Sequence, residues 1–457
     1  MILHIARRQL LDYISSPRFL LAALLCVLIG VGVTWVRCLA YEQALEEYRL
    51  IRQDNASEAA GYTQPGPLTY AGVAVTRAPN AMSIFYAGLE PDRPVSFRVA
   101  ANRDPAAESQ YERSNPVRSF FVAMYFTAFV TLIVSILAIA LGYDTISGEK
   151  EAGTLKLMLS FPVPRSSVVL GKALGGLCAL GVPLLLTALG SLLVGVLSPG
   201  IGLRASGVLS FCLLTVTALL FLAAIYSLTI CVSSLTSRAF TTVTALIAIW
   251  VLLAVGIPGI SPHLARALVE VPSSHEVEND KWSITDDENR ARFLEIVEYQ
   301  KNPHGSSVDQ MAFYSELFRK SFLSIATRQE QIHASFERRL YRQIESAGWV
   351  SRASPLASFV YVAGTLADTG IDDRYRFRRA LQSYRIRFLN YAEDKWMQRE
   401  VDGTGSITTR DYPRFVFLRP GIVDRFQASL LDLGLLAAWA LIFLAVTLVA
   451  FLRYDPR

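Results

Sequence analysis

The chain has 457 residues, of which 52% are hydrophobic and 18% are charged, and its formal net charge is +5 at pH 7. An apolar share this high, concentrated in blocks, excludes an ordinary soluble domain, and the modest positive charge gives no reason to expect a nucleic-acid partner. The cysteines have no CxxC spacing, so we expect neither a metal site nor a disulfide framework; they are Cys26, Cys38, Cys178, Cys212 and Cys231.

Residues 1–18 are predicted to form an interfacial amphipathic helix. Ile2, Ala6, Leu10 and Tyr13 fall on one face of a helix, whereas the charged residues fall elsewhere. A helix of this kind lies at a membrane surface with its apolar side toward the lipid. A Ser-Pro pair then directs the chain into the first apolar segment.

Six apolar segments are long enough to cross a bilayer, since a membrane helix needs roughly 20 mostly apolar residues. The first has no small-x-small cleavage site, so we interpret it as a retained span and not as a signal peptide. The apolar cores are Phe19–Val36, Ser119–Leu141, Ala173–Leu197, Val208–Val232, Phe240–Ile257 and Ala428–Phe451. We accordingly predict transmembrane helix one at 19–37, helix two at 119–142, helices three to five within 168–260, and helix six at 426–452.

Basic residues in the short connections predict the orientation. Lys150, Lys156, Arg165 and Arg238 fall in connections that are all cytoplasmic if the N-terminus is cytoplasmic, as the positive-inside rule requires. The tail at 453–457 is then cytoplasmic as well. We therefore expect a multi-pass protein of the cell inner membrane, with extracytoplasmic regions at 38–118 and 261–425.

The two extracytoplasmic regions have different patterns. In the first, a helical start, YEQALEEYRLIRQ, precedes TQPGPLTYAGVAVTRAPN, whose alternation predicts short strands. In the second, apolar stripes at helical spacing predict a helical hairpin whose aromatic face is buried against its partner helix or the first region. The stripes are Met311, Tyr314, Phe318, Phe322, Ile325, Ile332, Phe336, Leu340 and Ile344, then Phe377, Leu381, Tyr384, Phe388 and Tyr391. We expect SSHEVEND to be a flexible loop and SRASPLASFVYVAGTLADTGIDD to interrupt the helices.

The loop at 143–167 differs from the spans on either side of it. Its polar first half and its apolar Leu155, Leu157 and Met158 predict one short amphipathic helix parallel to the inner surface. Pro162 and Pro164 end that helix, because proline has no amide donor and its ring clashes with the preceding turn. Ser166 is a suitable cap for the next span. A projecting charged helix of this kind suits a protein whose membrane helices are moved by a soluble partner.

At this loop the chain resembles the permease subunits of ABC-2 type transporters. The matching residues include Gly148, Glu149, Lys150, Glu151, Gly153, Thr154, Leu155, Ser160, Pro162, Arg165, Gly171 and Lys172. The resemblance extends to the six-span plan and, through residues 353–385, to a subgroup with a large extracytoplasmic insertion between spans five and six. It implies an α-helical polytopic membrane protein with six transmembrane helices, an N-terminal interfacial helix and a mainly helical extracytoplasmic domain.

The resemblance also implies partners and a site. In that family the inner helix docks on an ATPase subunit, so the ATPase-coupling residues would be Gly148, Glu149, Lys150, Glu151, Gly153, Thr154 and Leu155. Two permease copies would assemble with two ABC ATPase subunits in the lipid bilayer. We expect Glu149 and Glu151 to be exposed and to act through docking, with little effect on folding.

No catalytic constellation is apparent in the sequence. A GxxxxGK[ST] phosphate loop is missing, so we expect ATP and Mg to be bound by the partner ATPase and no catalytic, cofactor or metal residues in this chain. Asp432, near the outer end of span six, is expected to be hydrated at the interface or paired with a basic residue.

The leading hypothesis is therefore the transmembrane subunit of an ATP-driven exporter. The alternative is a mechanotransmitter that rearranges the extracytoplasmic domain or a periplasmic partner without transporting cargo. A passive membrane anchor is a third interpretation, and it leaves the coupling motif unexplained.

Overall fold

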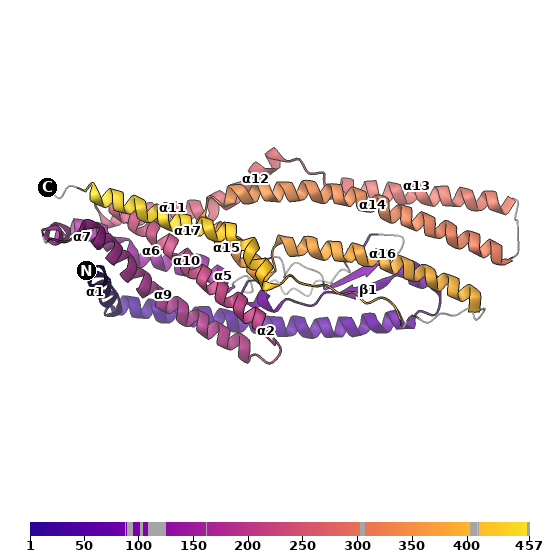
Figure 1. The fold of residues 1–457 in the computed structure, drawn as a ribbon, viewed down its shortest axis with the longest axis horizontal. Coiled ribbons are helices and arrows are strands. Elements are labelled where there is room, and N and C mark those ends of the chain that lie inside the picture. Colours follow the sequence, from indigo (N-terminus) through magenta and orange to yellow (C-terminus); the bar gives the residue numbers. More distant parts are fainter. Residues whose placement is uncertain are drawn as a thin grey trace.

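The computed structural model describes residues 1–86, 88, 95–100, 104–107, 125–160, 162–301, 307–402, 409 and 411–454. These residues form an elongated, mainly helical molecule (Figure 1). One half is a bundle of apolar helices, with α1, α7 and the C-terminal end of α17 at one end of the molecule. The other half, the distal lobe, comprises the C-terminal half of α2 with α3, β1–β3, α13, α14 and α16.

Six helices of the described chain are long and apolar enough to cross a membrane, which confirms the predicted number of spans. Two of them contain a π-helical turn, η3 or η4, between α-helical parts. In chain order they are α2 (Pro17–Gly61); α5 (Phe126–Phe129), η3 (Val130–Val134), α6 (Ser135–Gly142) and α7 (Asp144–Glu151); α9 (Arg165–Leu197); α10 (Ala205–Leu235); α11 (Ala239–Val251), η4 (Leu252–Gly256) and α12 (Ile257–Leu268); and α17 (Ile422–Leu452).

The first predicted span and the helical segment after it form one uninterrupted helix. Helix α2 has 45 residues, so it is roughly 68 Å long at 1.5 Å per residue. A bilayer core takes only about 30 Å of that length. No proline or helix-ending glycine falls between the apolar and charged halves, and the helix therefore continues from the bundle into the distal lobe (Figure 1). In the second predicted span, residues 119–124 lie outside the described residues.

Small residues allow the bundle helices to approach closely. A Cβ added at Gly176 in α9 would lie 1.8 Å from the hydroxyl oxygen of Tyr226 in α10, and one at Gly30 in α2 would lie 2.2 Å from Thr187 in α9. Close backbone approach is the usual basis of helix packing in membranes, where lipid removes the hydrophobic drive for association. Helix α10 is central to this packing and contacts α6, α9 and α17.

Helix α1 (Ile2–Ile14) packs along α9, as an amphipathic N-terminal helix should. A Cβ at Gly171 would lie 2.6 Å from Ile5, and one at Gly175 would lie 2.6 Å from the carbonyl oxygen of Ala6. The Tyr13 hydroxyl donates to the carbonyl of Leu141 at 2.7 Å. The predicted helix is therefore present, and it is attached to the span helices by direct contacts.

A three-stranded antiparallel sheet lies in the distal lobe. Strand β1 (Val73–Thr76) pairs with β2 (Ser96–Val99), and β2 pairs with β3 (Ala106–Ala107). The strand prediction is right only for Val73–Thr76, because the preceding residues form helix α3 (Pro65–Ala71). Pro65 starts α3, since proline at the first position of a helix loses no hydrogen bond. A 3-10 turn, η1 (Ala81–Ile84), follows β1.

The stripe of α16 (Ile371–Asp402) is buried against this sheet, which confirms one predicted packing. Leu381, Tyr384 and Phe388 form a cluster with Val73 and Val99 from the two longer strands. The two extracytoplasmic regions predicted from the sequence are therefore joined by one apolar core.

The two striped helices of the predicted hairpin, α14 and α16, do pack together, but α14 also packs against a helix that the sequence does not predict. Helix α14 (Ser307–Ser351) folds back on α13 (Ser274–Lys301), whose first residues were predicted to be a flexible loop, and that prediction is wrong. The polar face of α13 is exposed while Val277 and Ile284 are buried. A sparse apolar stripe is therefore enough to hold α13 against α14. Phe322 and Ile325 of α14 pack with Leu389 of α16.

The predicted interruption at 351–373 does separate the striped helices, because α14 ends at Ser351 and α16 begins at Ile371, but it contains an unexpected helix, α15 (Pro355–Ala367). Ser354 caps it by accepting a hydrogen bond from the Leu356 amide at 3.2 Å, and the same hydroxyl donates to the Leu253 carbonyl at 2.7 Å. Phe359 stacks on Phe221 of α10 with ring centroids 4.9 Å apart. Helix α15 therefore packs among the span helices, chiefly α10 and α17, and does not form a turn between lobe helices.

Candidate functional site

The loop predicted to be one amphipathic helix contains two short helices, α7 and α8 (Thr154–Leu159). Gly153 separates them with a φ of +74°, a left-handed conformation that glycine adopts without a Cβ penalty. Helix α9 begins at Arg165 after Pro164, with no side-chain cap, so the prediction that Ser166 caps this helix is wrong. Proline at the position before a helix already provides the extended backbone that a capping residue needs.

Ser233 of α10 fixes the start of α7. Its hydroxyl oxygen accepts hydrogen bonds from the amides of Ile146 and Ser147, at 3.1 Å and 2.9 Å, and donates to the Tyr143 carbonyl at 2.8 Å. The first amides of a helix have no partner within the helix, so a hydroxyl from a neighbouring helix replaces a capping residue here. The end of the second span is thereby bound to α10.

Glu149 binds α9. Its carboxylate lies 2.7 Å from the ammonium nitrogen of Lys172, whose side chain is only 4% exposed. Lys172 also donates to the Thr145 carbonyl at 2.7 Å, so both ends of α7 contact the same lysine. A charge removed from water needs a partner, and Glu149 provides it. The expectation that Glu149 is a freely exposed charge is therefore wrong.

Lys150 and Glu151 bind the facing ends of α10 and α11. The Lys150 ammonium donates to the carbonyls of Ser234 and Thr236, the latter at 3.0 Å, where α10 has unsatisfied carbonyl groups. The Glu151 carboxylate accepts from the Ala239 amide at 2.9 Å, at the first turn of α11. Both charges have the sign that favours their helix end, positive at the C-terminus and negative at the N-terminus.

Three consecutive side chains therefore connect α7 to three different span helices. We call Glu149, Lys150 and Glu151 the α7 triad. Each of its members forms a polar contact with a helix that follows it in the sequence, α9, α10 or α11 in turn. The α7 triad therefore joins α7 to all three helices by short polar contacts.

The remaining predicted coupling residues divide between the interior and the surface. Leu155 is fully buried in the bundle core, whereas Gly153 and Thr154 are exposed. Beyond them Lys156 is exposed, and Leu157 has 66% of its surface exposed. Gly148 is half-buried, where an added Cβ would lie 3.2 Å from Asp144. All seven residues fall within Gly148–Leu155, and the tip, Ala152–Leu157, is exposed except for Leu155.

The sequence did not reveal the partners of the triad. Lys172 belongs to the matching motif. As a lone charge close to an apolar segment, it also indicates that a partner of opposite charge is buried beside it. Ser233 carries no such signal, because a serine in an apolar helix more often bonds its own backbone. Only the packing of α10 against α7 identifies its role.

The expected alternatives for Asp432 are now resolved. Its carboxylate accepts two hydrogen bonds from Arg352, at 2.6 Å and 3.0 Å, and the residue is 4% exposed. Arg352 follows α14, so this pair connects the distal lobe to the first half of α17. The prediction that Asp432 pairs with a basic residue is confirmed.

A family model described as ABC-2 family transporter protein matches residues 3–456 of the chain. A relative from Pseudomonas aeruginosa, named "Probable ABC transporter permease protein NosY", is 45% identical over 49 residues, which are 11% of this chain and 18% of that protein. A protein of the same name from Stutzerimonas stutzeri is 39% identical over 56 residues, 12% of this chain and 20% of that protein.

The matched stretches thus span no more than a fifth of either relative, whereas the family match extends over nearly all of this chain. The bundle of six apolar helices agrees with that match. The protein belongs to the ABC-2 family of transporter proteins.

Proposed function

We propose that this chain is the transmembrane permease subunit of an ATP-driven ABC-2 exporter. Two copies would assemble with two ABC ATPase subunits, which bind ATP and Mg. The α7 tip and both chain ends would lie in the cytoplasm, and the distal lobe would lie outside the cell inner membrane. The two relatives are named as probable ABC transporter permeases, which supports this assignment.

The observation that carries the proposal is the α7 triad together with the exposed tip beside it. A soluble ATPase subunit can bind the tip at Gly153, Thr154, Lys156 and Leu157, because these residues are exposed. Movement of the tip then displaces α9, α10 and α11 through Glu149, Lys150 and Glu151. These residues act as positioning residues for the spans, and the buried Leu155 keeps α8 against the bundle.

The tip can be tested without disturbing the triad. In Lys156→Glu and Leu157→Asp, the exposed tip is altered, so we expect loss of ATPase association while membrane insertion and thermal stability stay unchanged. The matched control is Lys301→Glu, an exposed lysine at the end of α13 in the distal lobe. Co-purification with the ATPase and ATP hydrolysis by the complex are the measurements. Full association and hydrolysis in both tip variants would rule out docking at the tip.

A mechanotransmitter is the second candidate function, and the continuity of α2 supports it. One helix extends from the bundle into the lobe, where Ala59 joins the core formed with α16. A change of helix tilt near the α7 tip would therefore move part of the lobe directly. In this function the distal lobe or a periplasmic partner is rearranged and no cargo crosses.

Two measurements separate the candidates. Arg319 of α14 and Glu393 of α16 form an exposed ion pair at 3.1 Å, so cysteines at these two positions report movement within the lobe. A mechanotransmitter should show a crosslinking yield that changes with ATP in the reconstituted complex and no ATP-dependent export of lipid-like test compounds from vesicles. Export with an unchanged crosslinking yield favours the exporter.

A further inference from the structure

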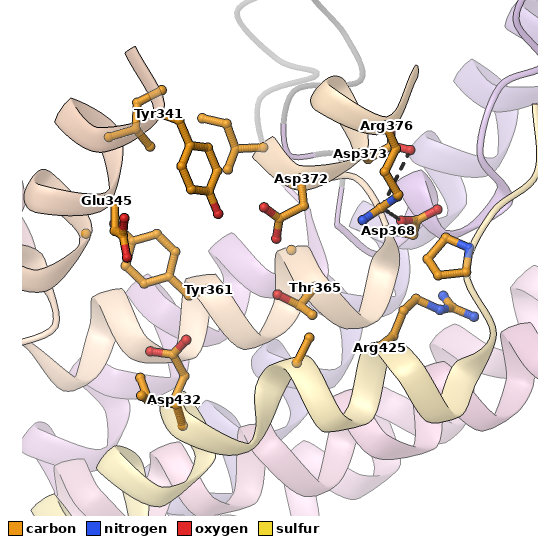
Figure 2. Close-up of a pocket in the computed structure, with 18 of the residues that line it drawn as sticks. Tyr341, Glu345, Tyr361, Thr365, Asp368, Asp372, Asp373, Arg376, Arg425 and Asp432 are labelled. Atoms are coloured by element: carbon orange, nitrogen blue, oxygen red, sulfur yellow. Dashed lines mark hydrogen bonds and ion pairs between the residues drawn. The ribbon is translucent and has the colours of Figure 1, made fainter. Parts of the chain in front are cut away.

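A cavity of about 410 Å³ lies where α17 enters the distal lobe, between the end of α14, helix α15 and the start of α16 (Figure 2). The first turns of α17 line it with Arg425, Ala428 and Leu431. The cavity therefore lies beside the start of an apolar helix. Leu431 is 48% exposed and Trp349 is 55% exposed. The cavity therefore has a wall of charged residues and, at Leu431 and Trp349, an exposed apolar surface.

The charges that line the cavity are unbalanced, with six carboxylates against three arginines. Two of the arginines are already paired with lining carboxylates, Arg352 with Asp432 and Arg376 with Asp368. The third, Arg425, donates to the Leu366 carbonyl at 2.7 Å. An anionic ligand would therefore have to displace an existing contact of an arginine.

Two of the carboxylates remain available. Asp373 pairs with Arg77 at 2.5 Å, and Asp424 accepts from the Gly421 amide at 3.2 Å. Glu345 and Asp372, by contrast, have no ion-pair partner among the residues that the structure describes, and both are exposed to the cavity mouth. These two acids come from different helices, α14 and α16, and lie on the same side of the cavity as Tyr341 (Figure 2).

The aromatic wall already holds a cation. The Arg352 guanidinium lies 4.6 Å from the ring centroid of Tyr361 and 5.3 Å from that of Trp349, while Asp432 neutralises its charge. Aromatic faces attract cations through their quadrupole, most strongly where water is excluded. Tyr341 with Glu345 and Asp372 repeats the combination of ring and carboxylate that binds Arg352, and the nearby cation, Arg352, is already paired with Asp432.

A buried acid in the cavity wall has one oxygen without a hydrogen-bond partner in the described part of the chain, although the charges of Arg376, Arg419 and Arg425 already act on it. The Asp368 residue is 3% exposed, and its Oδ2 has no hydrogen-bond partner in the described residues, although Oδ1 binds Arg376. Burial, and then the negative charge of Asp373, raise the pKa of Asp368 to about 6. The cavity wall would therefore gain stability from a further cation nearby.

We propose that this cavity binds a protonated primary amine attached to an apolar body. The ammonium group would lie between Glu345, Asp372 and the Tyr341 hydroxyl, and the body would lie against Ile344 and Leu431. A metal ion fits less well, since the described residues contain no group of three or more His, Cys, Asp or Glu that could hold one. The proposal concerns binding alone and does not depend on coupling to ATP.

The full chain in nanodiscs of phosphatidylglycerol provides the test, with isothermal titration calorimetry as the readout and empty nanodiscs subtracted. The probe is 2-phenylethylammonium, and 2-phenylethanol is its neutral counterpart. We expect saturable binding of the amine and about tenfold weaker binding of the alcohol, a difference of about 1.4 kcal/mol. Equal binding of the two compounds would overturn the proposal.

Variants assign the binding to this cavity. Glu345→Gln with Asp372→Asn should weaken amine binding by about tenfold, because it removes both carboxylate charges from the ammonium site. Thermal unfolding should be unchanged, since both side chains are exposed. The control is Asp287→Asn, an exposed acid on α13 away from the cavity. Amine binding by the double variant at wild-type affinity would also overturn the proposal.

A final arm distinguishes a soluble amine from a lipid headgroup, which carries the same ammonium group. Nanodiscs that contain phosphatidylethanolamine should weaken binding of the probe if that headgroup occupies the cavity. Unchanged affinity assigns the site to a soluble amine. Either result supports an ammonium site, because this experiment follows only if the neutral compound and the double variant bind more weakly. It decides whether the ammonium group comes from a soluble amine or from a lipid.

Discussion

The ammonium nitrogen of Lys172, in α9, lies 2.7 Å from the carboxylate of Glu149, in α7. The lysine side chain is 4% exposed and the glutamate side chain is 28% exposed. Glu149 therefore lies between the buried ammonium group of Lys172 and the solvent. Its position gives Glu149 a structural role in addition to any role in docking. The free energy of unfolding of a variant at either residue therefore has to be measured before any effect on ATPase binding is interpreted.

Lys172→Met should lower the free energy of unfolding only moderately, whereas Glu149→Gln should lower it by about 2 kcal/mol. Loss of Glu149 leaves a buried lysine without its counter-ion, and such losses cost several kcal/mol when both groups are fully buried. The partial exposure of Glu149 reduces this cost. Unfolding of the purified chain in detergent, followed as a double-mutant cycle, is the measurement.

The double variant should be more stable than Glu149→Gln alone, because it removes both charges together. Independent, additive effects of the two substitutions would show that the pair does not stabilise the fold.

Gly153→Ala should disturb docking of the ATPase more than it disturbs the fold. A Cβ at this position meets nothing within 4 Å, so the only cost is the left-handed backbone, about 1 kcal/mol. Gly202, between α9 and α10, is a matched control, since it too has a positive φ and open space around it.

Both alanine variants should show the same small loss of thermal stability. Only Gly153→Ala should reduce co-purification of the ATPase, because it changes the angle between α7 and the exposed tip. Equal association of the two variants with the ATPase would argue against a docking role for the turn.

The stability of the distal lobe should depend on pH through His333. Burial, and then the positive charges of Arg378 and Lys281, lower the pKa of His333 to about 4, although Asp104 acts in the opposite direction. The nearby Glu337 carboxylate, 3.5 Å from the ring, therefore faces a neutral histidine at pH 7. The fold favours the neutral ring.

This contribution is complete above an unfolded pKa of about 6.5 and is lost as the pH falls from there toward 4, by roughly 3 kcal/mol in total. Thermal unfolding between pH 7.5 and pH 4 should show it, and His333→Gln should flatten this part of the profile. The exposed His275→Gln is the control. A profile that His333→Gln leaves unchanged would contradict the prediction.

Labelling of single cysteines in intact cells should report the proposed orientation. In a background without the five native cysteines, Ser57→Cys in α2 and Arg342→Cys in α14 should react with an impermeant reagent, because both positions are exposed in the distal lobe. Thr154→Cys at the α7 tip should react only after permeabilisation. Reaction of Thr154→Cys in intact cells would place the tip on the outer side and remove it from contact with an ATPase in the cytoplasm.

The sequence by itself predicted the elements whose cause is local. Long apolar runs specify the six long helices, since no other structure satisfies so many backbone groups in lipid. The aromatic stripe through Tyr384 and Phe388 identified the buried face of α16 because helical periodicity brings these residues to one side. The seven predicted coupling residues all fall within the eight positions from Gly148 to Leu155, so their proximity required no tertiary information.

Only the tertiary structure decided which of those residues face inward. Glu149 and Glu151 have the same charge and similar spacing to the spans, yet one neutralises buried Lys172 and the other caps α11. Their partners are 23 and 88 residues away along the chain. The same holds for the cavity beside α17, whose acids come from separate helices. Contacts between residues so far apart in the sequence depend on how whole helices pack. The hydrophobic periodicity and the capping signals of one segment do not determine that packing.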